Sequence, residues 1–390
     1  MTSQVQAPAN KELTMSRPAI RTMVVGDHAT VVDLHVSAFG DRHNPQSQIS
    51  EFYRNLVTRC GVDDDNSPTR SLVADKDDQL VAMVFGAPVA LQLNGAPATA
   101  KVATLLATRS GNGDMTLSRR LLSEFFGDDV DLVLADRANS GGRRAAERSG
   151  MAFYPQYSLR WARVISPGRA AAAAALNRKP DVGRLGRRVL VGSARLTDAV
   201  TSRVLERVNG TAVPGRQRVV ATELTADDLA ANGGKVLSDF RLRPRFASAA
   251  DTAATWRSLE MLRSEGSHHR VAIRSCDGEL VAWYLLHVWP SGTGEVVQFG
   301  SLPSHHASAL NILIEHAEQL QLGSLHGQAH PTLNIALSDA GAVFHGRGSS
   351  FGVYTRNPEV QEALTQGQAY ITPLEGEYPL QLGRKSRQDS

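Results

Sequence analysis

The chain has 390 residues, of which 42% are hydrophobic and 21% charged, and its formal net charge is +3. This composition is typical of a globular protein long enough for two domains. The two cysteines, Cys60 and Cys276, are too few and too far apart for a disulfide framework, and they fit a reducing, cytoplasmic setting. No apolar run approaches the roughly 18 residues of a membrane span, and the first residues contain no signal-peptide core.

The first half of the chain predicts strands and helices in alternation, from the periodicity of its apolar residues. The expected order is strand, helix, helix, a two-stranded hairpin, strand, helix, strand, short helix and a last extended stretch. The residues expected in these elements are 19–24, a helix from His28, 50–57, 70–74, 80–85, 102–107, a helix through Leu121, 132–135, 140–149 and 153–164.

The same succession returns in the second half of the chain and predicts a duplicated architecture. Its expected elements are 218–222, a helix from Thr225, 256–262, 269–274, 280–288, 294–299, 307–322, 325–328, 332–339 and 351–355. Such a repeat constrains the fold more strongly than any single motif in the sequence.

A basic segment separates the two halves. Residues 160–218 contain 13 Lys or Arg and three Asp or Glu, a net charge of +10. Within this segment the alanine run 170–175 favours a helix, and residues 184–208 predict an amphipathic helix packed between the domains. Two interpretations stay open: a solvated linker paired with acidic surfaces, or a surface for an acidic partner such as tRNA.

A glycine-bearing turn, Arg109-Ser-Gly-Asn-Gly-Asp114, lies between an apolar strand and a helix. Backbone N–H groups at the start of a helix can hold a pyrophosphate. A lone Gly-x-Gly is equally typical of an ordinary turn, so this stretch alone leaves both interpretations open.

The order of elements in both halves resembles that of the Gcn5-related N-acetyltransferase (GNAT) superfamily, and Asn139 and Gly150 stand eleven residues apart as in its second signature. The resemblance implies an α/β fold with mixed sheets, in two tandem acyl-CoA N-acyltransferase-like domains. The ranges expected from it are a tail at 1–16, a first domain at 17–165, a basic helical linker at 166–214, a second domain at 215–382 and a tail at 383–390.

In that superfamily, acyl-coenzyme A (acyl-CoA) lies between two parted parallel strands, and a Gly-rich loop holds its pyrophosphate. The family positions for Gly-x-Gly fall on Asp114, Met115 and Thr116, so Gly111 and Gly113 would form a displaced nest of N–H groups. By resemblance, the residues expected to contact the donor, acetyl-CoA or another acyl-CoA, are Leu106, Gly111, Gly113, Met115, Thr116, Arg119 and Asn139. Asn139 can equally be a plain helix N-cap.

The catalytic residues of the family are incompletely matched. The position of its usual tyrosine proton donor is Ala146 in the first half, and residues 301–306, which precede helix 307–322 in the second half, contain no glycine. Glu295 is the candidate general base and Tyr354 the candidate proton donor for the second half, with Tyr284 as another. The alternatives are an exposed glutamate at a strand start and packed strand tyrosines.

Three functions are compatible with these features. The first is an N-acyltransferase that moves an acyl group from acyl-CoA to a small-molecule amine by direct attack in a ternary complex. The second is an amide-forming transferase that uses aminoacyl-tRNA, favoured by the incomplete loops and the basic segment. The third is a non-catalytic binding protein that retains the fold. No metal is expected, because the histidines lack the spacing of a metal site, and the oligomeric state stays open.

Overall fold

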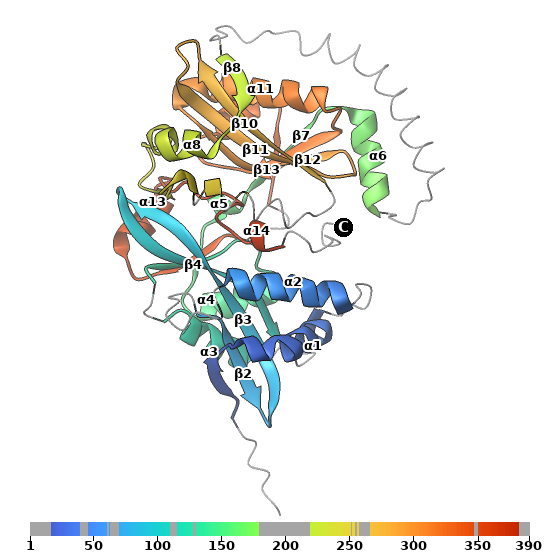
Figure 1. Cartoon of the computed structure of the whole chain (residues 1–390), viewed down its shortest axis with the longest axis vertical. Helices are drawn as coiled ribbons and strands as arrows, with labels where there is room; N and C mark the ends of the chain where they lie inside the picture. The colour runs from blue at the N-terminus through green and yellow to red at the C-terminus, as the bar shows by residue number, and fades with distance from the viewer. Residues whose placement is uncertain are drawn as a thin grey trace, which may run out of the picture.

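The computed structural model describes residues 17–39, 46–60, 62, 70–109, 115–127, 130–178, 219–250, 252–253, 256, 266–346 and 350–381. These residues form two mixed β-sheets that lie one above the other along the long axis of the molecule (Figure 1). The short helix α14 (Tyr378–Gln381) lies between the two sheets. The expected mixed α/β class is therefore confirmed.

The first sheet has the strand order β1-β2-β3-β4-β5-β15-β6, and β9 pairs with the far end of β3. Its strands are β1 (Ala19–Thr22), β2 (Leu72–Lys76), β3 (Gln79–Leu93), β4 (Ala96–Thr108), β5 (Leu132–Ala135), β6 (Ala152–Phe153), β9 (Leu242–Pro244) and β15 (Gly352–Thr355). All neighbours are antiparallel except β4 and β5, which run parallel.

Helices cover both faces of the first sheet, so its inner strands are buried on both sides. One face, which we call the α1 face, carries α1 (His28–Phe39) and α2 (Gln46–Arg59). The opposite face, the α3 face, carries α3 (Met115–Phe125) and α4 (Ser140–Arg148). Side chains alternate between the two: along β5, Leu132 and Leu134 join the α1-face core, whereas Val133 joins the α3-face core.

Strands β3 and β4 form a hairpin that is longer than the sequence indicated, since the apolar pattern marked only 80–85 and 102–107 of them. Asn94 and Gly95 make the turn, with φ of 52° and 83°. Both residues in the left-handed region define a type I′ turn, for which Asn-Gly is the preferred pair. The distal end of the hairpin reaches the other half of the chain, where Leu91–Leu93 pair with β9.

The second sheet has the order β14-β7-β13-β12-β11-β10-β8. Its strands are β7 (Arg160–Val164), β8 (Val219–Glu223), β10 (Ser267–Ser275), β11 (Leu280–Val288), β12 (Thr293–Ser301), β13 (Ser324–Gln328) and β14 (Val343–His345). One face carries α11 (His306–Gln319) and α12 (Asn334–Asp339). On the other lie α8 (Ala226–Asp228), the π-helical turn Leu229–Gly233 and α9 (Gly234–Val236).

The two halves exchange one strand each. β7, from the first half of the sequence, lies between β13 and β14 in the second sheet. β15, from the second half, lies between β5 and β6 in the first sheet. The last strand of each expected set, within 153–164 and at 351–355, therefore belongs to the sheet formed mainly by the other half. Neither sheet is complete without residues from the other half.

The predicted extended stretch 153–164 is interrupted. Residues Pro155–Ser158 form the helical turn α5, because proline fixes φ and fits the first position of a helix. The buried Tyr157 lies in this turn, and its hydroxyl accepts a hydrogen bond from the N–H of Ala369 at 3.1 Å. This break redirects the chain from β6 in the first sheet to β7 in the second.

Two further helices follow the exchanged strands, α6 (Pro167–Arg178) after β7 and α13 (Pro358–Thr365) after β15. α6 confirms the helix expected at the alanine run 170–175. The amphipathic helix predicted at 184–208 lies outside the described residues, as do both predicted tails and most of the helix predicted at 256–262.

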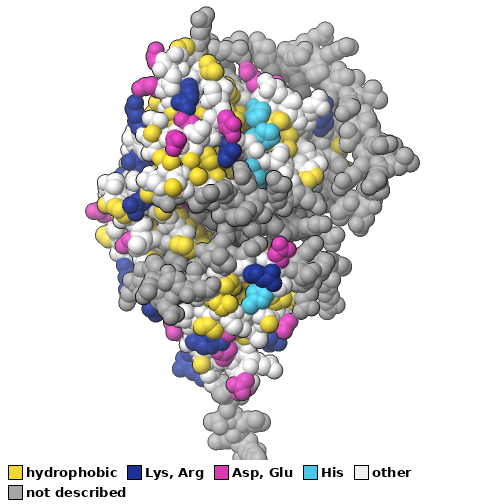
Figure 2. Space-filling model, in the orientation of Figure 1, with side chains coloured by type: hydrophobic (Ala, Val, Ile, Leu, Met, Phe, Trp, Pro, Cys, Tyr) yellow, Lys and Arg dark blue, Asp and Glu magenta, His cyan; other side chains and the backbone are white. Residues whose placement is uncertain are grey.

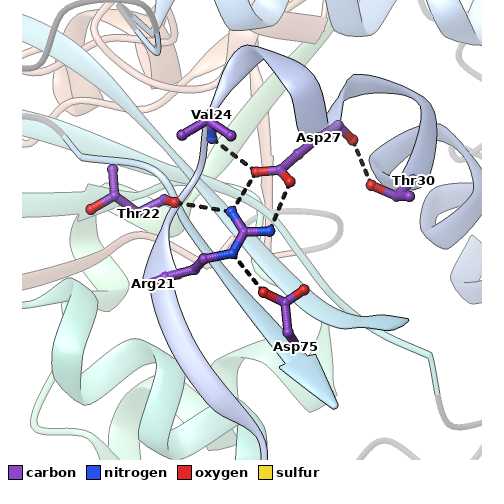
Figure 3. A network of polar contacts seen from close by, with 6 residues as sticks. All are labelled: Arg21, Thr22, Val24, Asp27, Thr30 and Asp75. Carbon is purple, nitrogen blue, oxygen red and sulfur yellow. Dashed lines mark hydrogen bonds and ion pairs between the residues drawn. The ribbon is translucent and has the colours of Figure 1, made fainter. Parts of the chain in front are cut away.

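One arginine, Arg21, links strand β1 to its neighbours in the first sheet (Figure 3). Arg21 donates from Nη1 and Nη2 to the two carboxylate oxygens of Asp27, at 2.7 and 2.8 Å, and from Nε to Asp75 at 2.6 Å. Burial raises the pKa of Asp27, but its bonds to Arg21 and to the Val24 N–H outweigh burial and hold the pKa below its usual value. The network joins β1 to β2 and to the turn that precedes α1.

Gly323, directly before β13, packs against the backbone of α6, the helix that follows the exchanged strand β7. Replacing Gly323 tests this packing. A Cβ there would lie 2.6 Å from the backbone nitrogen of Ala170, and backbone cannot move aside as a side chain can. Gly323→Ala is therefore expected to lower the free energy of unfolding by about 1–3 kcal/mol in urea titrations. Gly234→Ala, where a Cβ meets no atom within 4 Å, is the control and should leave stability unchanged or slightly raised. Equal effects of the two variants would contradict the packing described.

Candidate functional site

The first sheet opens between its two parallel strands. β4 and β5 pair only from Ala100 to Val102, and β4 continues to Thr108 while β5 ends at Ala135. The structure thus confirms a pair of parted parallel strands, which we call the first opening. Backbone N–H and C=O groups become available to a ligand where neighbouring strands stop pairing, so the opening is the first candidate for a ligand site.

A β-bulge lies in β4 where the strands part. Thr104 stands opposite Phe85 and Ala107 opposite Met83, so one more residue lies on β4 than on β3 over this interval. Leu105 has a φ of 54°, a conformation that costs a non-glycine residue roughly 1–2 kcal/mol. Bulges bend a strand and redirect its groups, and strained backbone often accompanies function.

Two helices start beside the first opening on the α3 face. α3 begins at Met115, and α4 begins after Asn139, whose side-chain oxygen accepts a hydrogen bond from the N–H of Gly142 at 2.8 Å. The free N–H groups of such starts favour anions. Asn139 acts as an N-cap in this structure, the plainer of its two interpretations.

The residues expected to contact the donor lie along this edge as far as the structure describes them. Leu106 and Met115 are half-buried and pack against the α3-face core, whereas Thr116 and Arg119 are exposed on α3. Gly111 and Gly113 lie outside the described residues, as does Asp114. Arg109 donates from Nε to the backbone oxygen of Leu80 at 3.0 Å.

A second opening lies between β12 and β13. These strands pair from Thr293 to Val296, opposite Ser324 to Gly327, and then part. A pocket at this place is lined by both strands, by α11 and α12, and by the segment Tyr370–Pro373. The space in it that water-sized molecules can occupy is about 30 Å³, which is room for a water molecule or two.

Tyr370 is the residue that fills the second opening. It is 2% exposed, and its hydroxyl donates to the backbone oxygen of Phe299 on β12 at 2.6 Å. Its ring also packs near Phe240 and His330, with ring centroids at 5.2 and 5.6 Å. The chain itself therefore occupies the place between β12 and β13.

A chain of buried polar groups secures the segment that carries Tyr370. Trp283 Nε1 donates to Gln298 Oε1 at 3.0 Å, and Gln298 Nε2 donates to Glu375 Oε1 at 2.9 Å. The other oxygen of Glu375 accepts from the N–H of Thr372 at 2.7 Å and also contacts the Thr372 hydroxyl. Burial raises the pKa of Glu375 to about 7, against the lowering effect of these hydrogen bonds.

The raised pKa of Glu375 predicts a pH dependence of stability. The folded chain retains this proton up to about pH 7, whereas the unfolded chain loses it near pH 4.5. Stability should therefore fall as pH rises between these values, by about 3 kcal/mol from this group. Burial lowers the pKa of His287 and His330 from 6.5 to about 4, so these two groups add an opposite slope between those values, over much of the same pH range. The test measures the unfolding free energies of wild type and Glu375→Gln from pH 5 to 8. The difference between the two should change with pH, and parallel plots of free energy against pH would contradict the prediction.

Glu295 lies below the second opening, in the part where β12 and β13 still pair. It is 9% exposed and forms ion pairs with Arg160 Nη2 at 2.9 Å and Arg137 Nη2 at 3.8 Å. Burial raises its pKa, but the charges of the two arginines outweigh burial and hold the pKa below its usual value. A carboxylate with a lowered pKa is a weak general base. The geometry is that of an ion pair joining the first half to the second, and it does not resemble the exposed strand-start glutamate considered as the alternative.

The structure does not bring Tyr354 and Glu295 together. Tyr354 lies on β15 in the first sheet, opposite Val133, so it is no part of the second sheet for which it was expected to donate a proton. Its ring stacks on Phe126 at 4.7 Å, and its hydroxyl accepts a hydrogen bond from Arg356 at 3.2 Å. Tyr284 is buried, with its hydroxyl 2.8 Å from His316 Nδ1.

Sequence reasoning missed three residues at the openings: Thr104, Asp136 and Tyr370. An acidic residue directly after the buried strand Leu132–Ala135 is a signal that could have indicated Asp136. Nothing in the local pattern marks Thr104 or Tyr370, because their positions depend on a bulge and on a segment from the far end of the chain.

The histidines and acidic residues form no metal centre in the part of the chain that the structure describes. No group of three or more His, Cys, Asp or Glu side chains among these residues could hold a metal ion. No described helix combines the length and the hydropathy required to cross a membrane.

Comparison with solved structures identifies the fold. A GCN5-related N-acetyltransferase from Anabaena variabilis is 10% identical over 89% of this chain and 75% of its own, with a TM-score of 0.53. One from Kribbella flavida is 14% identical over 87% and 71%, with a TM-score of 0.50. A conserved protein from Enterococcus faecalis is 13% identical over 87% and 73%, with a TM-score of 0.53. The chain therefore has the GNAT fold.

The sequence comparisons add nothing to the structural ones. No protein-family model matches the chain, and no curated protein matches it significantly.

Proposed function

We propose that the chain is an N-acyltransferase and that the first opening holds its acyl-CoA donor. The observation that carries this proposal is the contrast between the two openings. Tyr370 and the segment that follows it fill the second. The first has a bulged β4 edge that extends beyond its pairing with β5, next to the starts of α3 and α4.

The donor would follow the α3 face into the first opening. Its diphosphate would bind near the start of α3, with Gly111, Gly113, Met115 and Thr116 beside it and Arg119 adding positive charge. Leu106 would contact the pantetheine arm, and Asn139 would order the start of α4. The thioester would then lie between the parted strands.

The reaction would be a direct attack of an amine on the thioester. The carbonyl oxygen gains negative charge in the transition state, and a backbone N–H at the bulge of β4 would stabilise it. Holding both reactants in line supplies several kcal/mol of barrier lowering without a covalent enzyme intermediate. One donor molecule per chain is sufficient for this reaction.

Calorimetry and a thiol-release assay test the proposal. Acetyl-CoA is expected to bind with a stoichiometry of one per chain, and free coenzyme A thiol should appear when a primary amine is added. The amine panel would include alkylamines, polyamines, amino sugars and lysine peptides. No heat with acetyl-CoA would overturn the proposal.

Bulk tRNA is the competing ligand in the same titration. The basic segment 160–218 favours this alternative, an aminoacyl-tRNA donor, and its binding would weaken steeply with salt. On the face drawn in Figure 2, however, described Lys and Arg side chains are interspersed with Asp and Glu. Salt-dependent tRNA binding without acetyl-CoA binding would replace the acyl-CoA proposal by this one.

A further inference from the structure

Thr104 and Asp136 lie on the two sides of the first opening, one on β4 and the other directly after β5. The last pair of β4 and β5 is Val102 with Leu134, and two residues further along each parallel strand lie Thr104 and Asp136. Val102 belongs to the α1-face core, and Thr104, two residues further along β4 and opposite Phe85 of the same core, lies on that face as well. The two residues therefore border the place where the thioester carbonyl would lie.

Both side chains are buried polar groups. Thr104 is 2% exposed, and among the described residues no group is a hydrogen-bond partner of its Oγ1. Asp136 is 9% exposed, and its Oδ1 accepts a hydrogen bond from the N–H of Glu377 at 3.0 Å. A buried hydroxyl without a partner costs free energy, and it is expected where a ligand supplies the partner.

The C-terminal segment fixes the position of the Asp136 carboxyl. A Cβ on Gly376 would lie 2.1 Å from Asp136 Oδ2, so only a residue without a side chain fits against this oxygen. The same segment continues from Tyr370 and Glu375, which are held at the second opening. The second half thus positions a group at the first opening.

Burial and the neighbouring charges shift the pKa of Asp136 in opposite directions. Burial raises the pKa of its carboxyl, while the charges of Arg137 and Arg160 and the Glu377 N–H lower it by smaller amounts. Glu377 is itself buried beside it, and Glu295 is ion-paired to both arginines. A carboxyl whose pKa lies above its ordinary value is a better proton acceptor than Glu295.

We propose that Asp136 is the general base of the acyl transfer and that the Thr104 hydroxyl holds the attacking nitrogen. This inference rests on the proposed function. The donor approaches along the α3 face, so the amine must reach the carbonyl carbon from the α1 face, where Thr104 lies, at the end of β5 that Asp136 follows. Thr104 Oγ1 then accepts a hydrogen bond from the amine, which gives the hydroxyl its partner.

The proposed step is balanced without a further reactant. The lone pair of the neutral amine forms the C–N bond, and the C–S bond breaks with its electron pair on sulfur. The Asp136 carboxylate takes one proton from the nitrogen and the thiolate is protonated through it or by water, which yields amide and free thiol. Asp136 is catalytic in this scheme because it touches the nitrogen, whereas Gly376 and the Glu377 N–H position it.

Asp136→Asn tests the base directly. Asparagine keeps the oxygen that accepts from Glu377 N–H but cannot take a proton at the pH of the assay. With acetyl-CoA and the best amine of the panel, kcat is expected to fall 100-fold or more, and the part of the pH dependence of the rate that comes from this carboxyl should disappear. Acetyl-CoA binding should stay unchanged. Asp131→Asn is the matched control, since Asp131 stands at the opposite end of β5 and also accepts from a backbone N–H, that of Thr99.

Thr104→Val separates function from folding. Valine has the same shape and removes a hydroxyl that has no partner among the described residues, so stability should not fall. The KM for the amine is expected to rise about tenfold, with acetyl-CoA binding unchanged. An unchanged KM, or an Asp136→Asn enzyme with the wild-type pH profile, would overturn this inference alone. A wild-type chain that binds no acetyl-CoA would overturn the proposed function, and this inference with it.

Discussion

Replacing Glu295 by glutamine is expected to lower the free energy of unfolding by about 3 kcal/mol. Its side chain is 11% exposed and those of its partners Arg160 and Arg137 are 20% and 29% exposed. Removing one member of a buried ion pair leaves charge without a counter-charge, which typically costs 3–5 kcal/mol, and partial exposure of the arginines favours the lower value. The effect is measured by urea unfolding at pH 7.

The matched control for Glu295→Gln is Glu147→Gln. Glu147 pairs with Arg143 at 2.8 Å, but their side chains are 42% and 47% exposed on the surface of α4. Such a pair contributes less than about 0.5 kcal/mol. If Glu295→Gln were as stable as this control, the role of Glu295 as a structural ion pair would be wrong. If the variant also abolished turnover, Glu295 would be a catalytic residue, as the sequence indicated.

Tyr370→Ala is expected to cost about 3–5 kcal/mol of unfolding free energy, because it removes a buried aromatic ring from the second opening and leaves a cavity. Tyr370→Phe should cost about 1 kcal/mol, since it removes only the hydrogen bond to the oxygen of Phe299. Thermal or urea unfolding of both variants gives these values.

Tyr354→Phe is the control for Tyr370→Phe, because the Tyr354 hydroxyl takes part in an exposed hydrogen bond. It should change stability by less than about 0.5 kcal/mol. A Tyr370→Ala chain as stable as wild type would show that Tyr370 does not fill the second opening, and it would remove the contrast on which the proposed donor site depends.

The sequence predicted many of the individual elements because apolar periodicity depends on local burial. The inner strands β5 and β12 and the long helices α3 and α11 appear where their patterns indicated them. The full length of the β3–β4 hairpin was missed, although its Asn94-Gly95 turn is a strong local signal. Its distal end pairs with β9, a contact between residues about 150 positions apart that no local pattern contains.

The strand exchange could not be predicted from the pattern, because the local sequences of the short strands β7 and β15 do not show which sheet each of them joins. The helical turn at Pro155, between β6 and β7, directs the chain away from the first sheet. The site depends on the same long-range arrangement. Asp136 obtains its partner from Glu377, 241 residues away, and the second opening is filled from Tyr370, 71 residues after Phe299.

The acyl donor is proposed to lie in the first opening and not in the second, and the rest of the mechanism depends on this placement. A crystal structure of the chain with acetyl-CoA tests it most directly. We expect one molecule per chain, with the diphosphate at the start of α3 and the thioester between Thr104 and Asp136. Acetyl-CoA found between β12 and β13, or at neither opening, would contradict the placement.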